Sequence, residues 1–235
     1  MSDALSGPIC ESCWGAIRFI TPPVCHGCGD PLPSWRALSC EAARCARCRR
    51  TSRAIARGRA IGEYDGALRQ IIHAFKYDGR RSLAGRLGRL MRESSGNLLD
   101  GVDWVVPVPL HPKRERARGF NQAAELAKTL DLPVCSPLVR IRQTMSQVDL
   151  PAARRHANVR GAFRLARPHP WLAPFTSGRS NLSNAIVVLV DDVSTTGATL
   201  EACARVLKDA GVREVRALTG ARVVRREPTT RQRSA

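Results

Sequence analysis

The residues with the clearest chemistry lie in segment 187–199. An apolar run, 185–190, ends at two adjacent carboxylates, Asp191 and Asp192, and a turn rich in Gly, Ser and Thr follows. Small residues let backbone N–H groups approach an anion, and hydroxyl groups donate further hydrogen bonds. Two carboxylates would repel a bare anion, but they can accept hydrogen bonds from the vicinal hydroxyl groups of a ribose. The pattern therefore predicts a site for a phosphorylated sugar.

The elements that must position these residues can be read from the same segment. The apolar run is too short for a buried helix and suits a strand that is covered on both faces of a parallel sheet. The carboxylates then lie at the carboxyl end of a strand, where open α/β sheets bind ligands. Leu200, Cys203, Ala204 and Leu207 have helical spacing, and Gly211 is the expected stop. The turn therefore precedes a helix, whose N-terminus favours a phosphate.

The segment resembles the phosphoribosyl pyrophosphate (PRPP) binding motif of type I phosphoribosyltransferases: apolar strand, acidic pair and T-T-G-x-T turn. The resemblance implies that Asp191 and Asp192 hold the ribose 2′- and 3′-hydroxyls in a catalytic site and that the turn binds the 5′-phosphate. The plainer alternative is a strand–turn–helix with acidic residues at a solvated strand end. The expected PRPP-binding residues here are Val193, Ser194, Thr195, Thr196, Gly197, Ala198 and Thr199.

A second polar group follows another predicted strand, 104–108. A rigid, proline-rich loop comes first, and residues 113–118 then contain four cations. Such a loop can hold a pyrophosphate through backbone N–H groups and Lys or Arg side chains. A solvated basic helix start is the alternative. We expect Pro109, Leu110, Lys113 and Arg114 to bind the pyrophosphate. His111 fits either a general acid–base role or a conformational one.

The polar, basic segment 140–163 shows little periodicity. A long polar segment inside a compact domain suggests a mobile functional loop. Such a loop would cover a reactive sugar and exclude water while its Arg side chains neutralise pyrophosphate. Its candidate residues are Arg142, Gln147, Arg155 and Asn158.

The cysteines concentrate at the N-terminus, where residues 1–50 hold seven of the nine. Four thiolates in two C-x-x-C knuckles separated by some 10–20 residues bind zinc tetrahedrally. The second and third C-x-x-C pairs have this spacing and predict a structural zinc ribbon, because a closed four-thiolate site leaves no position for substrate. The first pair could instead join the second. The three pairs are Cys10/Cys13, Cys25/Cys28 and Cys45/Cys48.

The net charge of +18 favours polyanionic partners, either nucleic acid or phosphorylated ligands. A GC-rich genome is an equally good explanation, because only four of the 38 basic residues are lysine. Residues 1–8 show no secretory signal, and no apolar run approaches the roughly 18–20 residues that span a bilayer. We therefore expect a soluble, cytoplasmic protein without membrane insertion, whose thiols are reduced.

Predicted strands (60–64, 104–108, 185–190, 215–218) alternate with predicted helices (68–75, 83–91, 120–130 and the one after Thr199). This order predicts an α/β fold with a parallel sheet. Residues 51–59 are interpreted as a basic connection and 166–184 as a loop. The expected organisation is a Cys-rich module, 1–50, a main domain, 51–224, and a disordered basic tail, 225–235.

As a whole the chain resembles the ComF family, phosphoribosyltransferase-like proteins linked in some bacteria to DNA uptake and natural competence. The resemblance implies a type I phosphoribosyltransferase-like sheet flanked by helices and a zinc ribbon at the N-terminus. Fuller members carry a further C-x-x-C before the first pair found here. The matching segments, besides the C-x-x-C knuckles and the PRPP-type motif, are 28–32, 75–79, 107–112, 118–122, 142–147 and 155–163.

Two functions follow from this resemblance. One is binding of PRPP with Mg²⁺ and transfer of phosphoribosyl to an unknown acceptor. The other is a non-catalytic adaptor of the same fold that binds single-stranded DNA and works with the competence machinery. A PRPP-sensing regulator is a weaker idea, because no helix-turn-helix is evident. The acceptor and the oligomeric state stay open.

Overall fold

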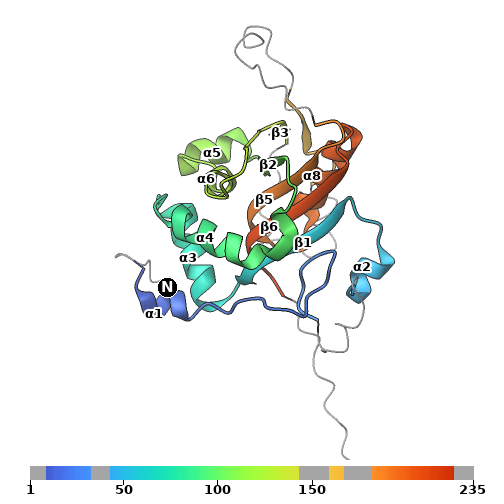
Figure 1. Ribbon diagram of the computed structural model, residues 1–235. Coiled ribbons are helices and arrows are strands. Elements are labelled where there is room, and N and C mark those ends of the chain that lie inside the picture. Colours follow the sequence, from blue (N-terminus) through green and yellow to red (C-terminus); the bar gives the residue numbers. More distant parts are fainter. Residues whose placement is uncertain (1–8, 33–42, 143–158, 167–181, 225–235) are drawn as a thin grey trace, which may run out of the picture.

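A four-stranded parallel sheet forms the centre of the described part of the molecule (Figure 1). The computed structural model describes residues 9–32, 43–142, 159–166 and 182–224. The strand order is β1-β6-β5-β2, and every neighbouring pair is parallel. The predicted parallel α/β sheet is therefore confirmed. The strands are β1 (Ile55–Glu63), β2 (Trp104–Pro107), β5 (Ile186–Ser194) and β6 (Glu214–Arg222).

Strand β5 is buried on both faces, as its unbroken apolar run predicts. Successive side chains of a strand point to opposite faces. Val188 and Val190 accordingly pack in the core beneath three helices, whereas Val187 and Leu189 pack in a second core beneath one helix. Figure 1 shows the two layers on either side of the sheet. The three helices are α3 (Gly66–Tyr77), α4 (Leu83–Ser95) and α6 (Gln122–Lys128), and the single helix is α8 (Ala198–Asp209).

The helices occur where their apolar spacing predicts them, and side chains cap two of them. Asp65 accepts a hydrogen bond from the Gly66 N–H at the start of α3, and Asn121 accepts one from the Ala123 N–H at the start of α6. Such caps satisfy backbone donors that the helix leaves without a partner.

The interpretation of 51–59 as a connection is wrong, because β1 begins at Ile55 within it. Two charged residues, Arg57 and Arg59, interrupt the apolar pattern that would indicate a buried strand. The guanidinium of Arg57 lies 3.4 Å from the carboxylate of Glu214 on β6, so the charge is paired with a residue distant in sequence. The last strand, β6, is also longer than the predicted 215–218.

Short elements complete the described structure. Helices α1 (Glu11–Gly15) and α2 (Ala46–Arg50) lie in the Cys-rich module, α5 (Pro112–Arg118) follows β2, and a 3₁₀ turn, η2 (Gly96–Leu99), follows α4. Strands β3 (Leu138–Arg140) and β4 (Phe163–Leu165) pair antiparallel at the two ends of the polar segment. Within the described residues, no helix has both the length and the apolarity to cross a membrane. The expected tail, 225–235, lies outside these residues.

Candidate functional site

The acidic pair lies near the carboxyl end of β5, in the middle of the sheet. Asp191 stands in register with Thr219 of β6. The two strands approach closely here, because a Cβ atom on Gly220 would lie only 2.9 Å from the carbonyl oxygen of Asp192. Position 220 therefore has no room for a side chain, and the backbone of the acidic pair is held firmly against β6.

Lys76 compensates the charge of one of the two carboxylates. Its Nζ lies 2.9 Å from Oδ1 of Asp192, and the two side chains are only 14% and 12% exposed. Burial lowers the pKa of Lys76, but attraction to Asp192 outweighs it, and the pKa is raised overall. The positive charge of Lys76, at the end of α3, thus lies beside the acidic pair.

Asp191 has a different environment. Its Oδ1 accepts a hydrogen bond of 2.9 Å from the backbone N–H of Asp192, and no ion pair to it is found among the described residues. Burial and the neighbouring charge of Asp192 raise the pKa of Asp191 to about 7, against the opposing effects of Lys76 and Arg140. The site therefore contains one carboxylate that is already paired and one that titrates near neutral pH.

The turn after β5 leads into α8, as the sequence predicts. Gly197 has φ 76° and is the N-cap of α8, a left-handed conformation that glycine adopts without strain. Oγ1 of Thr196 accepts a hydrogen bond of 3.4 Å from the Ala198 N–H, and Ser194 and Thr196 are buried. Val193, Thr195 and Thr199 are partly exposed. The helix N-terminus and the hydroxyl groups lie in one turn directly after Asp191 and Asp192.

The basic loop begins beside the acidic pair, because β2 and β5 are neighbours. The Val108 N–H donates a hydrogen bond of 2.9 Å to the Val190 carbonyl. Pro109, Leu110 and Arg114 are partly exposed, and Lys113 is exposed. The two anion-binding candidates, the loop after β2 and the turn after β5, thus flank the same strand end.

His111 is the N-cap of α5. Its Nδ1 accepts a hydrogen bond of 3.3 Å from the Lys113 N–H, and Pro112 occupies the first turn. This contact favours the conformational role for His111 over the acid–base role.

Arg140 is a further residue of the site, and it is not among the candidates that the sequence pattern predicts. It lies on β3, is 9% exposed, and its guanidinium stands 5.3 Å from the centre of the Phe163 ring. Burial and the charge of Arg114 lower the pKa of Arg140, whereas Asp191 opposes this effect. Arg114 and Asp191 therefore both act electrostatically on Arg140. Arg142, the candidate two residues further on, is exposed.

The sequence contains a signal for each of the two additional site residues, Lys76 and Arg140. Lys76 is one of four lysines in a chain that otherwise uses arginine. Arg140 stands between two β-branched residues, Val139 and Ile141, and so alternates with them along a strand. The remaining cover candidates, Gln147, Arg155 and Asn158, lie outside the described residues.

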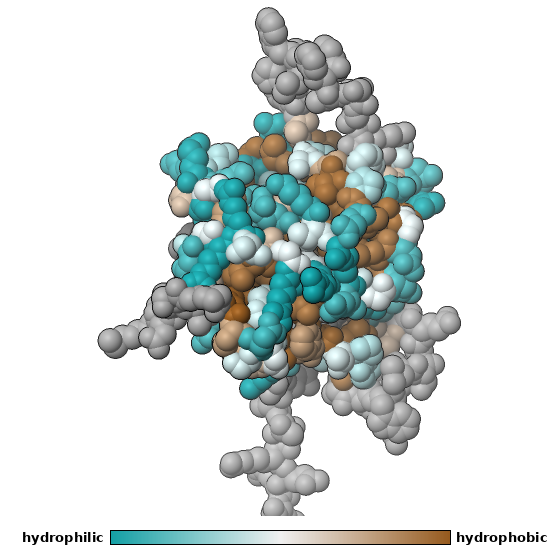
Figure 2. Space-filling view, turned by 60° about the vertical axis from the view of Figure 1, so that its left-hand side comes forward, coloured by the Kyte–Doolittle hydropathy of each residue, from teal (hydrophilic) through white to brown (hydrophobic). Residues whose placement is uncertain are grey.

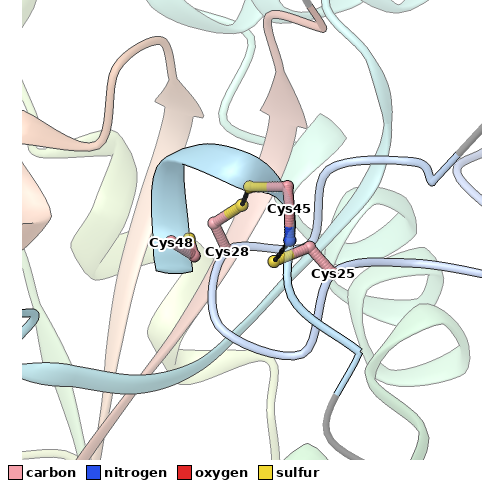
Figure 3. Close-up of side chains that lie close together, drawn as sticks. All are labelled: Cys25, Cys28, Cys45 and Cys48. Carbon is pink, nitrogen blue, oxygen red and sulfur yellow. Dashed lines mark hydrogen bonds between the residues drawn. The ribbon is translucent and has the colours of Figure 1, made fainter. Parts of the chain in front are cut away.

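The second and third C-x-x-C pairs meet in one cluster. The Sγ atoms of Cys25, Cys28, Cys45 and Cys48 lie within 4.8 Å of one another, and Figure 3 shows the side chains of two knuckles converging. In a tetrahedral zinc site with Zn–S of 2.3 Å, the sulfur atoms lie about 3.8 Å apart. The cluster is therefore compatible with a structural zinc.

The first pair lies apart from this cluster. Sγ of Cys10 is 3.2 Å from Sγ of Cys13, beside α1, and neither residue is buried. The structure therefore does not bring the runner-up ligands, Cys10 and Cys13, to the second pair.

The comparisons with known proteins agree with this architecture. The model of the phosphoribosyl transferase domain family matches residues 116–232. Competence protein F of Haemophilus influenzae is 30% identical over 223 residues, which cover 88% of this chain and 93% of the relative. The DNA utilization protein YhgH of Salmonella typhimurium is 31% identical over 211 residues, covering 85% and 83%.

Solved structures show a weaker likeness. The allosteric regulatory enzyme of purine biosynthesis has a TM-score of 0.36 at 21% identity, covering 59% of this chain and 25% of that chain. A hypoxanthine phosphoribosyltransferase of Staphylococcus aureus has a TM-score of 0.32 at 14% identity, covering 61% and 63%.

The parallel sheet, the acidic pair at the end of β5 and the domain match define a protein of the type I phosphoribosyltransferase fold class. Similarity to competence protein F extends over 88% of the chain and 93% of that relative. The chain belongs to the ComF family.

Proposed function

We propose that this protein binds PRPP with Mg²⁺ at the carboxyl end of β5 and transfers its phosphoribosyl group to an acceptor. One observation carries the proposal: the acidic pair lies between two loops suited to anions, the turn after β5 and the loop after β2. A molecule with a phosphate at one end, a pyrophosphate at the other and a diol between them matches this order of groups.

In this proposal, different residues bind the ribose, the 5′-phosphate and the pyrophosphate of PRPP. The carboxylate of Asp191 accepts hydrogen bonds from the ribose hydroxyls, and Asp192, tied to Lys76, supports the same face of the sugar. The turn Ser194–Thr199 holds the 5′-phosphate through hydroxyl groups and the helix N-terminus. Arg114 and Lys113, with the loop that includes Pro109 and Leu110, hold the pyrophosphate.

A magnesium ion fits this donor set, because Asp191 offers a carboxylate oxygen, the kind of ligand that Mg²⁺ prefers. When bound with the substrate, the ion neutralises charge on the pyrophosphate. The protein's own part is positioning and charge stabilisation. The C1–O bond breaks, its electron pair leaves with pyrophosphate, and the acceptor donates an electron pair to C1. This transfer needs no protein nucleophile.

The first prediction concerns Asp191→Asn, which keeps the shape of the side chain and leaves the Lys76–Asp192 pair intact. Each hydrogen bond to a charged group contributes about 1.5–3 kcal/mol, so we expect the affinity for Mg-PRPP to fall roughly 10- to 100-fold. Isothermal titration calorimetry measures it. Asp209→Asn, at an exposed position at the far end of α8, is the matched control. Equal affinity in both variants would refute the proposed ribose contact.

Turnover is tested separately from binding. Wild-type protein with Mg-PRPP and a panel of nucleobases and amines should release pyrophosphate with at least one acceptor. Release with none of them, despite tight PRPP binding, would favour the adaptor over the enzyme.

Binding of single-stranded DNA is the second candidate function. Relatives are named for competence and DNA utilization, and the net charge is +18. Figure 2 shows hydrophilic residues interspersed with hydrophobic ones on the side that carries α3 to α6. We therefore propose a role in handling DNA during competence, together with other proteins of that machinery.

The second prediction tests DNA binding. A protein that neutralises several phosphates of a single strand shows log affinity that falls with log salt, with a slope of about −0.7 per phosphate. Filter binding of an oligonucleotide across a salt series should give a clear negative slope. A flat dependence, or no binding at low salt, would contradict DNA binding and leave the phosphoribosyl site unaffected.

A further inference from the structure

The cysteine module and the phosphate-binding turn are in direct contact. Arg47, on α2 between two of the clustered cysteines, donates a hydrogen bond of 3.4 Å from NH1 to the Thr196 carbonyl. Its NH2 lies 3.7 Å from the carboxylate of Asp30, which also pairs with Arg222 of β6. Arg222 in turn donates a hydrogen bond of 3.3 Å to Oγ of Ser194. The module therefore contacts the turn directly at Thr196 and, through Arg222, at Ser194.

Arg53 joins the two parts most directly. Its NH1 donates a hydrogen bond of 3.2 Å to Sγ of Cys48, and its Nε lies 3.6 Å from Oε2 of Glu201 in the first turn of α8. Its NH2 stands 3.3 Å from where a Cβ of Gly197 would lie. One guanidinium thus touches a sulfur of the cluster, the N-cap of α8 and the first turn of that helix.

Glu201 completes the connection. It is 7% exposed, and its Oε1 accepts a hydrogen bond of 2.6 Å from the Ala54 N–H at the start of β1. A buried carboxylate with this set of partners holds the start of α8 in one place relative to Arg53. Removal of Arg53 would leave that buried carboxylate with only the exposed Arg205, whose Nε lies 3.8 Å from Oε1, and weaker charge compensation is costly in a buried setting.

We infer that Arg53 and Glu201 are positioning residues that couple the metal state of the four-cysteine cluster to 5′-phosphate binding by the turn Ser194–Thr199. Groups that hydrogen-bond to metal ligands fix the geometry of those ligands, and their loss typically weakens metal affinity 10- to 100-fold. The Arg53–Cys48 contact is of this kind, and the same side chain orders the turn. The inference rests on the proposed function, since it concerns the phosphate half of that site.

Coupling of this kind is reciprocal. If a loaded cluster raises the affinity for a 5′-phosphate, a bound 5′-phosphate raises the affinity of the cluster for zinc by the same factor. Ribose 5-phosphate should therefore lower the fraction of zinc that wild-type protein has transferred to a colorimetric chelator at equilibrium, and pyrophosphate should do so much less.

The test compares Arg53→Met with Arg57→Met. Arg53 lies just before β1 and Arg57 lies within it, and each pairs with a glutamate. Their side chains are similarly buried, at 12% and 18% exposed, but of the two only Arg53 contacts the turn. Calorimetry is carried out with ribose 5-phosphate and, separately, with magnesium pyrophosphate. Networks of this kind modulate coupling by 0.5–2 kcal/mol, so Arg53→Met should weaken ribose 5-phosphate binding roughly 2- to 30-fold. Pyrophosphate affinity should not change, and Arg57→Met should change neither.

Two further measurements separate positioning from general damage to the fold. Arg53→Lys keeps the charge but cannot contact sulfur and carboxylate together, so it should rescue binding only in part. Removal of metal should weaken ribose 5-phosphate binding in wild type and have a smaller additional effect in Arg53→Met. Wild-type affinity in Arg53→Met, or an equal loss for ribose 5-phosphate and pyrophosphate, would overturn the inference.

Failure of the proposed function can be distinguished from failure of the coupling. If wild-type protein binds neither ligand, the phosphoribosyl site is refuted, and the coupling is then judged by hydrogen exchange of residues 194–200. Exchange should be slower in the zinc-loaded wild type than in the stripped protein or in Arg53→Met. Equal exchange in all three would refute the coupling itself.

Discussion

Two adjacent aspartates of β5 have unlike surroundings, and this difference supports different proposed roles for them. Asp192 is paired with buried Lys76, whereas Asp191 has a pKa raised to about 7 by burial and by its neighbour. The proposed contact with the ribose hydroxyls needs a carboxylate that is not already paired, and Asp191 fits this requirement. The same arrangement makes the charge of Asp191 a cost to the empty protein, as expected where function opposes stability.

The third prediction follows from that cost. Because the pKa of Asp191 is raised in the folded state, the folded protein holds a proton that the unfolded chain releases at lower pH. Stability is therefore lost as pH rises from about 4 to about 7. Asp191→Asn removes the titration, and its stabilising effect should be larger at about pH 8 than at about pH 5 by about 2–3 kcal/mol. Thermal unfolding at both pH values measures it, and an equal effect at the two would contradict the assignment.

At the scale of elements, β2 and β5 bring two loops together that are far apart in sequence. The loop after β2 owes its shape to a helix cap: Nδ1 of His111 accepts from the Lys113 N–H, and the amide of Asn121 donates to the Val108 carbonyl. Short elements such as α5 depend on such contacts, because little of their surface is buried.

The fourth prediction distinguishes capping from chemistry at His111. His111→Ala should destabilise the protein by about 1 kcal/mol, the usual effect of losing a cap, and His111→Asn should restore most of it. Pyrophosphate affinity and any turnover should survive in the Asn variant, because a cap and not an acid is required. Loss of turnover in both variants, with stability restored in one, would instead identify His111 as an acid or base.

At the scale of the whole molecule, the Cys-rich module is packed against the sheet and the start of α8. Close backbone contact marks the junction, since a Cβ on Gly29 would lie 2.8 Å from the Gly58 carbonyl oxygen of β1. Residues 9–32 and 43–50 therefore contact the main domain closely. We propose that the boundary near residue 50 separates two parts of one folding unit.

The fifth prediction concerns zinc in that unit. Cys28→Ser should abolish stoichiometric zinc and lower the unfolding temperature, because a structural metal contributes folding free energy directly. Cys10→Ser is the matched control, as it also interrupts a C-x-x-C pair but lies outside the cluster. Elemental analysis and thermal unfolding measure the two effects. Equal zinc loss in both variants would show that the first pair also binds metal.

Local patterns could be predicted from the sequence because their information lies within a few residues. Each of these features is encoded by a contiguous segment: the amphipathic helices, the apolar strand β5, the acidic pair and the turn after it. Strand β1 could not be predicted in full, because Arg57 interrupts the apolar pattern at its start and the ion-pair partner of Arg57, Glu214, lies on a strand distant in sequence. The role of Lys76 could not be predicted for the same reason, because its partner Asp192 lies in another element.

By itself, the sequence determined which groups this protein offers: an acidic pair before a phosphate-type turn, a basic loop after a strand, and thiols spaced for zinc. The tertiary structure decided which of them meet. It paired Lys76 with one aspartate, brought Arg140 towards the other, and excluded Cys10 and Cys13 from the thiol cluster. The physical reason is that these contacts join residues distant in the chain, so they exist only once the sheet and its helices have packed.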